Sequence, residues 1–216
     1  MSIPEHAGGA LRLRFGALVF VLSGPSGVGK DSVLAGLQQI ENDLHYCVTA
    51  TTRPPRTGEQ EGVDYYFLSE AEFEQLRSSG GLLESAQVHG RSYGLPAAQV
   101  QDAVAEHHDV MACVDVQGAR SIRARIPAAV LIFLAPSSLD ELRQRLTDRG
   151  TEDSQQLELR LANAEGELDQ IPLFDYVVIN GDGELDRAVD AVRAIIRSER
   201  MRVAPRYASL NKAVGH

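Results

Sequence analysis

A glycine-rich segment that ends in lysine is the part of this sequence best suited to chemistry. Residues 24–30 read Gly-Pro-Ser-Gly-Val-Gly-Lys, directly after an apolar run at 17–22 and directly before a helical pattern. Glycines let backbone N–H groups turn inward onto an anion, the helix adds the positive end of its dipole, and the lysine adds a full charge. A glycine-rich turn that binds nothing is the simpler alternative, but the lysine and the flanking elements argue against it. The segment predicts binding of a nucleoside triphosphate or a ligand of that shape.

The residue after this lysine departs from the usual pattern. Asp31 stands where such loops place the Ser or Thr whose hydroxyl ligates Mg²⁺, and Ser32 follows it. A carboxylate beside a triphosphate is repulsive unless a cation lies between them. Asp31 therefore either helps to hold magnesium, directly or through water, or is a first-turn acid that favours the helix dipole and points away. The metal role is the favoured interpretation.

A second candidate phosphate site lies in the stretch Thr49-Ala-Thr-Thr-Arg53-Pro-Pro-Arg56. Two arginines three residues apart, stiffened by prolines and preceded by hydroxyls, form a fork suited to a phosphate dianion. Tyr65 and Tyr93 could add phenolic donors. A solvated basic turn is the alternative. The phosphate loop nearby favours the binding role, because phosphoryl transfer needs a second site for the acceptor phosphate.

Composition limits the class of protein. The chain has 216 residues, 44% of them hydrophobic and 24% charged, which suits one α/β domain with inserted lobes. A net charge of −9 argues against a sequence-independent nucleic-acid partner, and no apolar run is long enough for a membrane partner. Cys47 and Cys113 have no metal-type spacing and predict two reduced core cysteines in a cytoplasmic protein. The oligomeric state is left open.

The apolar runs predict a parallel sheet covered by helices on both faces, because strands and helices alternate along most of the chain. The expected core strands are 17–22, 109–115, 129–134 and 175–179, and the expected helices are 30–41, 117–125, 138–148, 154–170 and 183–201.

Two segments interrupt this alternation. Within 45–98, strand-like pieces at 63–68 and 82–88 flank a helix at 70–78, which predicts a small inserted antiparallel lobe. The segment 143–162 is helical, carries arginines and has Gly150 at a break, as expected of a mobile lid. The remaining stretches 15–44, 99–142 and 163–203 are assigned to the core, and 1–14 and 204–216 to flexible tails.

Taken together, these motifs resemble the guanylate kinase family, in order and with the family's spacing from about residue 17 to 201. The matching segments are residues 24–30, Thr51-Thr-Arg-Pro-Pro-Arg-Thr-Gly-Glu59, Gly62-Val-Asp-Tyr-Tyr-Phe67, Leu83-Glu84, Tyr93-Gly94, Val114-Asp-Val-Gln-Gly-Ala119 and the arginines Arg145, Arg149 and Arg160. The resemblance implies a P-loop kinase fold with a core, a GMP-binding lobe and a lid. It also implies Mg²⁺-dependent transfer of phosphate from ATP to GMP, a reaction of purine metabolism.

The resemblance also implies roles for individual residues. The ATP side would comprise Gly24, Pro25, Ser26, Gly27, Val28, Gly29, Lys30, Asp31, Ser32 and Asn180. The GMP side would comprise Thr49, Arg53, Arg56, Tyr65, Glu84, Tyr93 and Asp115. The catalytic cations would be Lys30, Arg145, Arg149 and Arg160, the three arginines closing from the lid over the triphosphate. A solvated helix face is the alternative for the lid arginines, and a loop-initiating residue is the alternative for Asn180. His45, His89, His107 and His108 are interpreted as non-catalytic, since this chemistry needs no strong general base.

Guanine selectivity is expected to come from Glu84 and Asp115. Guanine presents N1–H and an amino group on one edge, and carboxylates only accept hydrogen bonds. Adenine lacks that N1–H and would leave a buried carboxylate unpaired, at a cost of about 1–3 kcal/mol. The alternatives are an exposed strand acid for Glu84 and a helix-capping acid for Asp115.

Two further departures affect the site. Leu95 stands where the family has a Ser or Thr that donates to guanine O6, which shifts selectivity onto the two acids. Cys113 stands two residues before Asp115, where many members carry another acid, and Asp31 could replace the missing charge.

Two other functions remain open on the sequence. A ribose 1,5-bisphosphate kinase shares a Gly-Lys-Asp-Ser loop but lacks the full stretch from Arg53 to Glu59 and the paired acids. A guanylate-kinase-like module that binds phosphopeptides without catalysis usually has a damaged phosphate loop, whereas Lys30 is present here.

Overall fold

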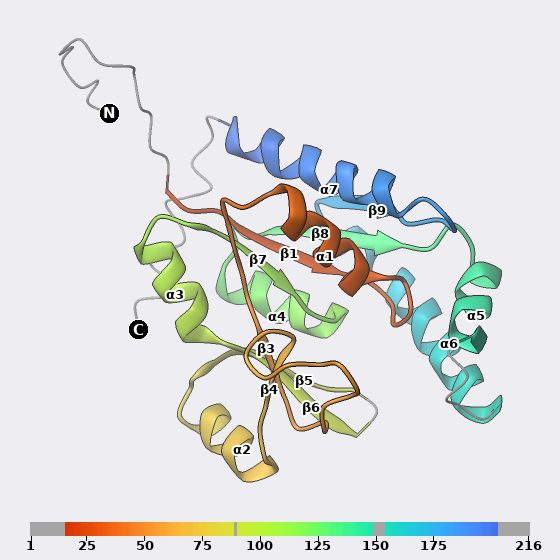
Figure 1. The fold of residues 1–216 in the computed structure, drawn as a ribbon, viewed down its shortest axis with the longest axis horizontal. Helices are drawn as coiled ribbons and strands as arrows, with labels where there is room; N and C mark the ends of the chain where they lie inside the picture. The colour runs from red at the N-terminus through yellow and green to blue at the C-terminus, as the bar shows by residue number, and fades with distance from the viewer. Residues whose placement is uncertain (1–15, 89, 149–153, 203–216) are drawn as a thin grey trace.

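A parallel sheet forms the centre of the molecule (Figure 1). The computed structural model describes residues 16–88, 90–148 and 154–202. The five strands of the central sheet all pair in parallel, in the order β2–β7–β1–β8–β9. They are β1 (Val19–Ser23), β2 (Leu44–Tyr46), β7 (Asp109–Cys113), β8 (Val130–Ala135) and β9 (Tyr176–Ile179). The predicted fold class is confirmed.

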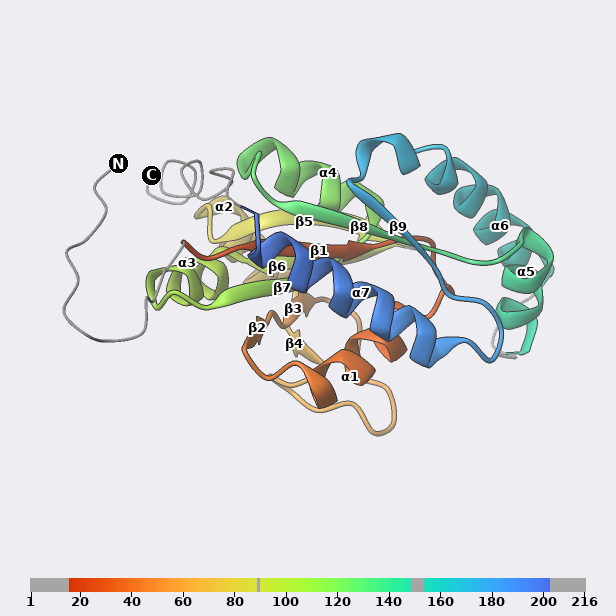
Figure 2. The same cartoon turned by 90° about the horizontal axis from the view of Figure 1, so that it is seen from above.

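Helices cover both faces of this sheet (Figure 2). These helices are α1 (Lys30–Ile40), α3 (Ala97–Ala105), α4 (Val116–Arg125) and α7 (Leu185–Arg200). Alternate residues of a strand point to opposite faces of the sheet. In β1, Phe20 and Leu22 therefore pack with residues of α1 and α7, whereas Val19 and Val21 pack with residues of α3 and α4. The buried faces of these helices fix the carboxyl ends of β1 and β7, where the candidate site lies.

The inserted lobe contains a second sheet, in the order β4–β3–β6–β5. Its elements are β3 (Thr49–Thr51), β4 (Tyr65–Phe67), α2 (Glu70–Ser78), β5 (Leu82–Val88) and β6 (Arg91–Pro96). The prediction of an antiparallel lobe is wrong for one pair: β3 and β4 run parallel, whereas β6 runs antiparallel to both β3 and β5. The long connection from β3 to β4 permits the parallel pairing, which a tight hairpin could not form.

Short elements account for most of what the sequence patterns missed. No strand was predicted at β2, β3 or β6, and no helix at α3. β2 and β3 have three residues each, and β6 contains Gly94 and Pro96, which normally count against a strand. The helix α2, by contrast, has the predicted bounds, because Ser69 and Glu72 form a capping box at its start.

The described residues of the segment 143–162, predicted as a lid, belong to two longer helices, α5 (Leu139–Asp148) and α6 (Ser154–Leu168). They pack on each other through Leu142, Leu146, Leu161 and Ala164. The single-turn helix η1 (Ile171–Leu173) then leads into β9. Arg149, Gly150, His89 and the predicted tails lie outside the described residues. None of the helices in the described part of the chain is long and apolar enough to cross a membrane.

Candidate active site

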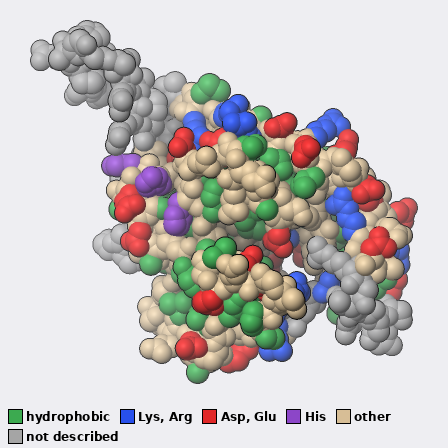
Figure 3. Space-filling view, in the orientation of Figure 1, with side chains coloured by type: hydrophobic (Ala, Val, Ile, Leu, Met, Phe, Trp, Pro, Cys, Tyr) green, Lys and Arg blue, Asp and Glu red, His purple; other side chains and the backbone are tan. Residues whose placement is uncertain are grey.

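A cleft of about 590 Å³ lies between the core, the inserted lobe and α6. The surface is hollowed between the lobe and the core, with acidic and basic side chains beside the hollow (Figure 3). The cleft brings together predicted residues from segments far apart in the sequence. These are Gly24, Ser26, Lys30, Asp31, Thr49, Tyr65, Glu84, Tyr93, Asp115 and Arg160.

The phosphate loop has the backbone geometry that its glycines predicted. Gly24, Gly27 and Gly29 have φ values of 142°, 87° and 94°. A Cβ on Gly24 would lie only 2.1 Å from the carbonyl oxygen of Leu134, so the loop could not pass β8 with any larger residue there. Gly29 then precedes the first residue of α1, which points the N-terminus of that helix at the cleft.

Polar side chains hold the loop through its carbonyl oxygens. The Lys30 ammonium donates to the carbonyls of Gly24 at 2.6 Å and Pro25 at 3.2 Å. Asn180, which is 4% exposed, donates through Nδ2 to the carbonyl of Val28 at 2.8 Å. Arg145 donates to the same Val28 carbonyl at 3.2 Å and to the Asn180 carbonyl at 2.9 Å, and it also pairs with Glu141. In this structure, Asn180 and Arg145 therefore contact the back of the loop, and neither lines the cleft.

Asp31 lies in the first turn of α1 and lines the cleft rather than pointing away from it. Its charge acts on two neighbours. The pKa of Tyr65 is raised, mainly by burial and next by the charge of Asp31. Burial also raises the pKa of the Cys113 thiol to about 12; the charge of Lys30 opposes this shift and the charge of Asp31 adds to it. The carboxylate is therefore close to both the phosphate loop and the inserted lobe.

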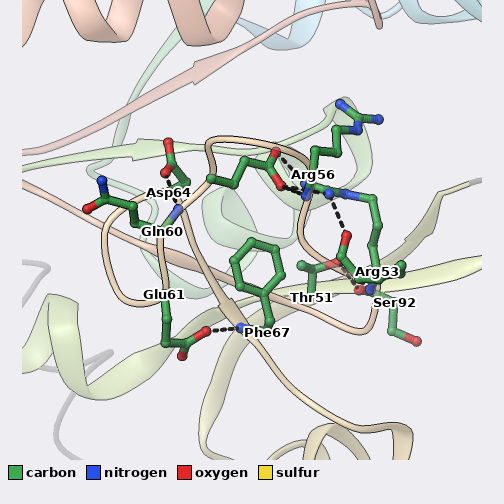
Figure 4. Close-up of polar contacts among 10 residues, drawn as sticks. Thr51, Arg53, Arg56, Gln60, Glu61, Asp64, Phe67 and Ser92 are labelled. Carbon is green, nitrogen blue, oxygen red and sulfur yellow. Dashed lines mark hydrogen bonds and ion pairs between the residues drawn. The ribbon is translucent and has the colours of Figure 1, made fainter.

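Arg53 is held in an ion pair instead of facing the cleft. Its two terminal nitrogens each donate to the Glu59 carboxylate at 2.9 Å, and the guanidinium lies 5.1 Å from the Tyr65 ring centre and 5.7 Å from that of Phe67. The hydrogen bonds from Arg53 are the main cause of a lowered pKa for Glu59. The exposed Arg56 donates its backbone N–H to the same carboxylate at 2.7 Å, and its side chain is directed away from Arg53 (Figure 4). The two arginines of the predicted fork thus do not converge in this structure.

The two predicted base-reading acids meet at the start of α4. Asp115 caps this helix by accepting from the Gly118 N–H at 2.7 Å, as the capping alternative predicted, and it also lines the cleft. Glu84 is 5% exposed, and burial first and the charge of Asp115 second raise its pKa to about 8. A Cβ on Gly118 would lie 2.7 Å from Glu84 Oε2, so the glycine leaves the space that this carboxyl occupies.

The other two departures from the family pattern, Leu95 and Cys113, lie in different places. Leu95 is fully buried in the core cluster with Leu83 and Val100, so its side chain does not line the cleft. Both cysteines are free; Cys47 is buried as predicted, but Cys113 lines the cleft instead of lying in the core.

Sequence reasoning missed several polar residues of the cleft: Gln117, Arg120, Asn163, Glu167 and Gln170. A signal for two of them was present. Asn163 and Glu167 follow Arg160 by three and seven residues, which is the spacing of one helix face. The pattern alone does not say which face of α6 turns towards the cleft.

Comparisons with known proteins agree with this geometry. The family model described as guanylate kinase matches residues 17–199. The guanylate kinase of Oceanobacillus iheyensis is 44% identical over 193 residues, covering 88% of this chain and 93% of its own, and that of Latilactobacillus sakei is 42% identical, covering 92% and 97%. The crystal structure of guanylate kinase from Anaplasma phagocytophilum has a TM-score of 0.76 at 31% identity, covering 90% of this chain and 92% of its own. The chain therefore belongs to the guanylate kinase family and is a nucleoside monophosphate kinase.

Proposed function

We propose that this enzyme transfers the γ-phosphate of ATP to GMP, giving ADP and GDP. The observation that carries the proposal is the meeting of Lys30, at the phosphate loop, with the acids Glu84 and Asp115 in one cleft. The loop and the N-terminus of α1 suit the triphosphate, and the two acids suit the N1–H and amino group of guanine. A cytoplasmic location is part of the proposal, supported by the unpaired Cys47 and Cys113.

Catalysis in this site consists of positioning and charge stabilisation. Lys30 neutralises charge on the transferring phosphate, and Arg160 adds a second cation from α6. Arg145 and Asn180 hold the loop from behind, so we assign them a positioning role towards ATP. Arg149 keeps its proposed lid role on the sequence resemblance alone. The acceptor phosphate binds near Thr49, Tyr65 and Tyr93, and Arg53 and Arg56 turn to it once it arrives.

The donor set fits Mg²⁺ held mainly by the nucleotide. The described residues contain no group of three or more His, Cys, Asp or Glu side chains placed to hold a metal ion. Mg²⁺ is usually bound by one or two carboxylates together with substrate phosphates and water, and Asp31 supplies one carboxylate in the cleft. When bound with ATP, the ion would neutralise charge on the β- and γ-phosphate oxygens. Asp31 would hold it directly or through water.

A coupled assay of ADP release with ATP and Mg²⁺ tests the proposal, using GMP, AMP and ribose 1,5-bisphosphate as acceptors. We expect turnover with GMP and a kcat/KM with AMP that is roughly 5- to 150-fold lower, because adenine leaves a buried acid unpaired at a cost of about 1–3 kcal/mol. Turnover with the ribose bisphosphate alone would replace the proposal with the sugar kinase. ATP binding without turnover of any acceptor would replace it with a non-catalytic binding module.

A further inference from the structure

The lid helix α6 turns one polar face into the cleft. Arg160, Asn163 and Glu167 lie three and four residues apart on this face, and all three line the cleft. Arg160 can interact favourably with the nucleotide phosphates, because their charges are opposite. The carboxylate of Glu167 on the same face cannot, because it repels phosphates as strongly as the arginine attracts them.

Glu167 lines the cleft close enough to both ends for their charges to act on it. Burial raises its pKa to about 7, while Lys30 at the phosphate end opposes the shift and Asp115 at the base end adds to it. Its Oε2 atom is shielded from solvent and has no hydrogen-bond partner in the described part of the chain. A buried polar atom left in this way costs about 1–3 kcal/mol, so a ligand that supplies a donor would gain that energy on binding.

The chemistry of the acceptor nucleotide leaves one class of donor for this carboxyl. Phosphate oxygens only accept hydrogen bonds, and Glu84 and Asp115 already face the donor edge of the base. The ribose hydroxyls are the remaining donors. The ribose joins the base to the phosphate, and Glu167 is near both Asp115 at the base end and Lys30 at the phosphate end. We propose that Glu167 accepts a hydrogen bond from a ribose hydroxyl of the acceptor nucleotide, so that the lid helix recognises the acceptor's sugar. This inference rests on the proposed use of GMP.

Deoxy analogues provide the test, because they delete the proposed donor without changing the protein. The kcat/KM and the dissociation constant are measured for GMP, 2′-deoxy-GMP and 3′-deoxy-GMP with the unmodified enzyme and with Glu167→Ala. The unmodified enzyme should lose about tenfold or more with one of the two analogues, the size expected for a hydrogen bond to a charged group. Glu167→Ala should lose a similar factor with GMP, mainly in KM, and nothing further with that analogue.

A matched control lies on the same helix. Glu165 is an exposed acid of α6 that does not line the cleft, so Glu165→Ala should leave all three acceptors unchanged. Thermal melting of both variants checks that α6 still folds. A loss confined to Glu167→Ala then belongs to the carboxyl and not to the helix.

Other outcomes overturn the inference. If the losses from Glu167→Ala and from each deoxy analogue multiply independently, the carboxyl does not touch the sugar. If the losses multiply independently and Glu167→Ala also needs a higher Mg²⁺ concentration for half-maximal rate, Glu167 contributes to Mg²⁺ binding instead. If the unmodified enzyme neither binds nor phosphorylates GMP, the proposed function itself fails and the inference with it, which the GMP measurements reveal before any variant is made.

Discussion

The phosphate loop and the opposite side of the cleft differ in how fully their polar groups are hydrogen-bonded. On the proposed ATP side, Lys30, Asn180 and Arg145 all donate to backbone carbonyls of the phosphate loop. On the proposed GMP side, the buried Glu84 and the partly buried Glu167 have raised pKa values, and one oxygen of Glu167 has no partner among the described residues. The phosphate loop is held in shape by its own contacts, whereas the proposed GMP side includes an acceptor, Glu167 Oε2, to which no described residue donates.

This difference has a functional consequence. Because Lys30, Asn180 and Arg145 hold the loop through its carbonyl oxygens, these contacts occupy none of its N–H groups, and ATP should bind with little rearrangement. Buried acids with raised pKa values must lose protons as guanine binds, so GMP recognition should depend on pH and on small changes in packing. Four experiments test this contrast.

Removing the loop cation should have the largest effect. Lys30→Met is expected to lower kcat by about 10³-fold, because the cation at the transferring phosphate is lost. GMP binding, measured by calorimetry without ATP, should stay within about twofold if the two halves are independent. Lys30→Arg tests whether charge alone suffices. A large loss of GMP affinity in Lys30→Met would contradict the division of the cleft.

The second effect is the pH dependence of GMP binding. Glu84 has a pKa raised to about 8, so at pH 6 it carries a proton that must leave before the carboxylate can accept from guanine. GMP affinity should therefore rise with pH up to about 8, by at most about tenfold per unit for this one proton. Calorimetry at pH 6, 7 and 8 measures the slope, with ATP binding as the internal reference.

Glu84→Gln should flatten this profile between pH 7 and 8 and reduce the preference for GMP over AMP. Glu167, whose pKa is raised to about 7, acts in the same direction at lower pH, so part of the slope below pH 7 should remain. An unchanged slope above pH 7 in the variant would exclude Glu84 as the titrating group.

A single methyl group tests packing on the GMP side. Gly118→Ala would place a Cβ 2.7 Å from Glu84 Oε2 and 3.0 Å from Val114 Cβ, so the carboxyl must move. We expect the KM for GMP to rise about tenfold with the KM for ATP unchanged. Gly36→Ala is the matched control, because its Cβ would meet Val189 Cγ2 at 2.8 Å in the core. This control should lower the melting temperature and leave both KM values unchanged. Equal effects of the two substitutions on the KM for GMP would show a general loss of packing.

The smallest effect is expected behind the phosphate loop. Asn180→Ala removes the hydrogen bond to the Val28 carbonyl, while Arg145 still donates to that oxygen. The loss should be about 1–2 kcal/mol of unfolding free energy, or a fall of roughly 2–8 °C in the melting temperature. The KM for ATP should rise only a few fold. A melting temperature equal to that of the unmodified enzyme would mean that Arg145 alone is enough to hold the Val28 carbonyl.

Much of the fold could be predicted because it follows from local patterns. The apolar runs of β1 and β8 are buried on both faces and read as strands within two residues of their ends, and the capping box at Ser69 fixes the start of α2. The elements that were missed lack such signals. β6 contains glycine and proline and forms only because β5 and β3 pair with it on either side.

The sequence by itself determined the phosphate loop, its following helix and the family, because these depend on residues adjacent along the chain whose backbone preferences are local. Only the tertiary structure decided which of the distant groups share the cleft. It pairs Arg53 with Glu59, buries Leu95 in the core, and brings Glu167 of α6 near both Lys30 and Asp115. The physical reason is that ion pairing, burial and pKa depend on neighbours brought together by packing, and no spacing along one chain encodes them.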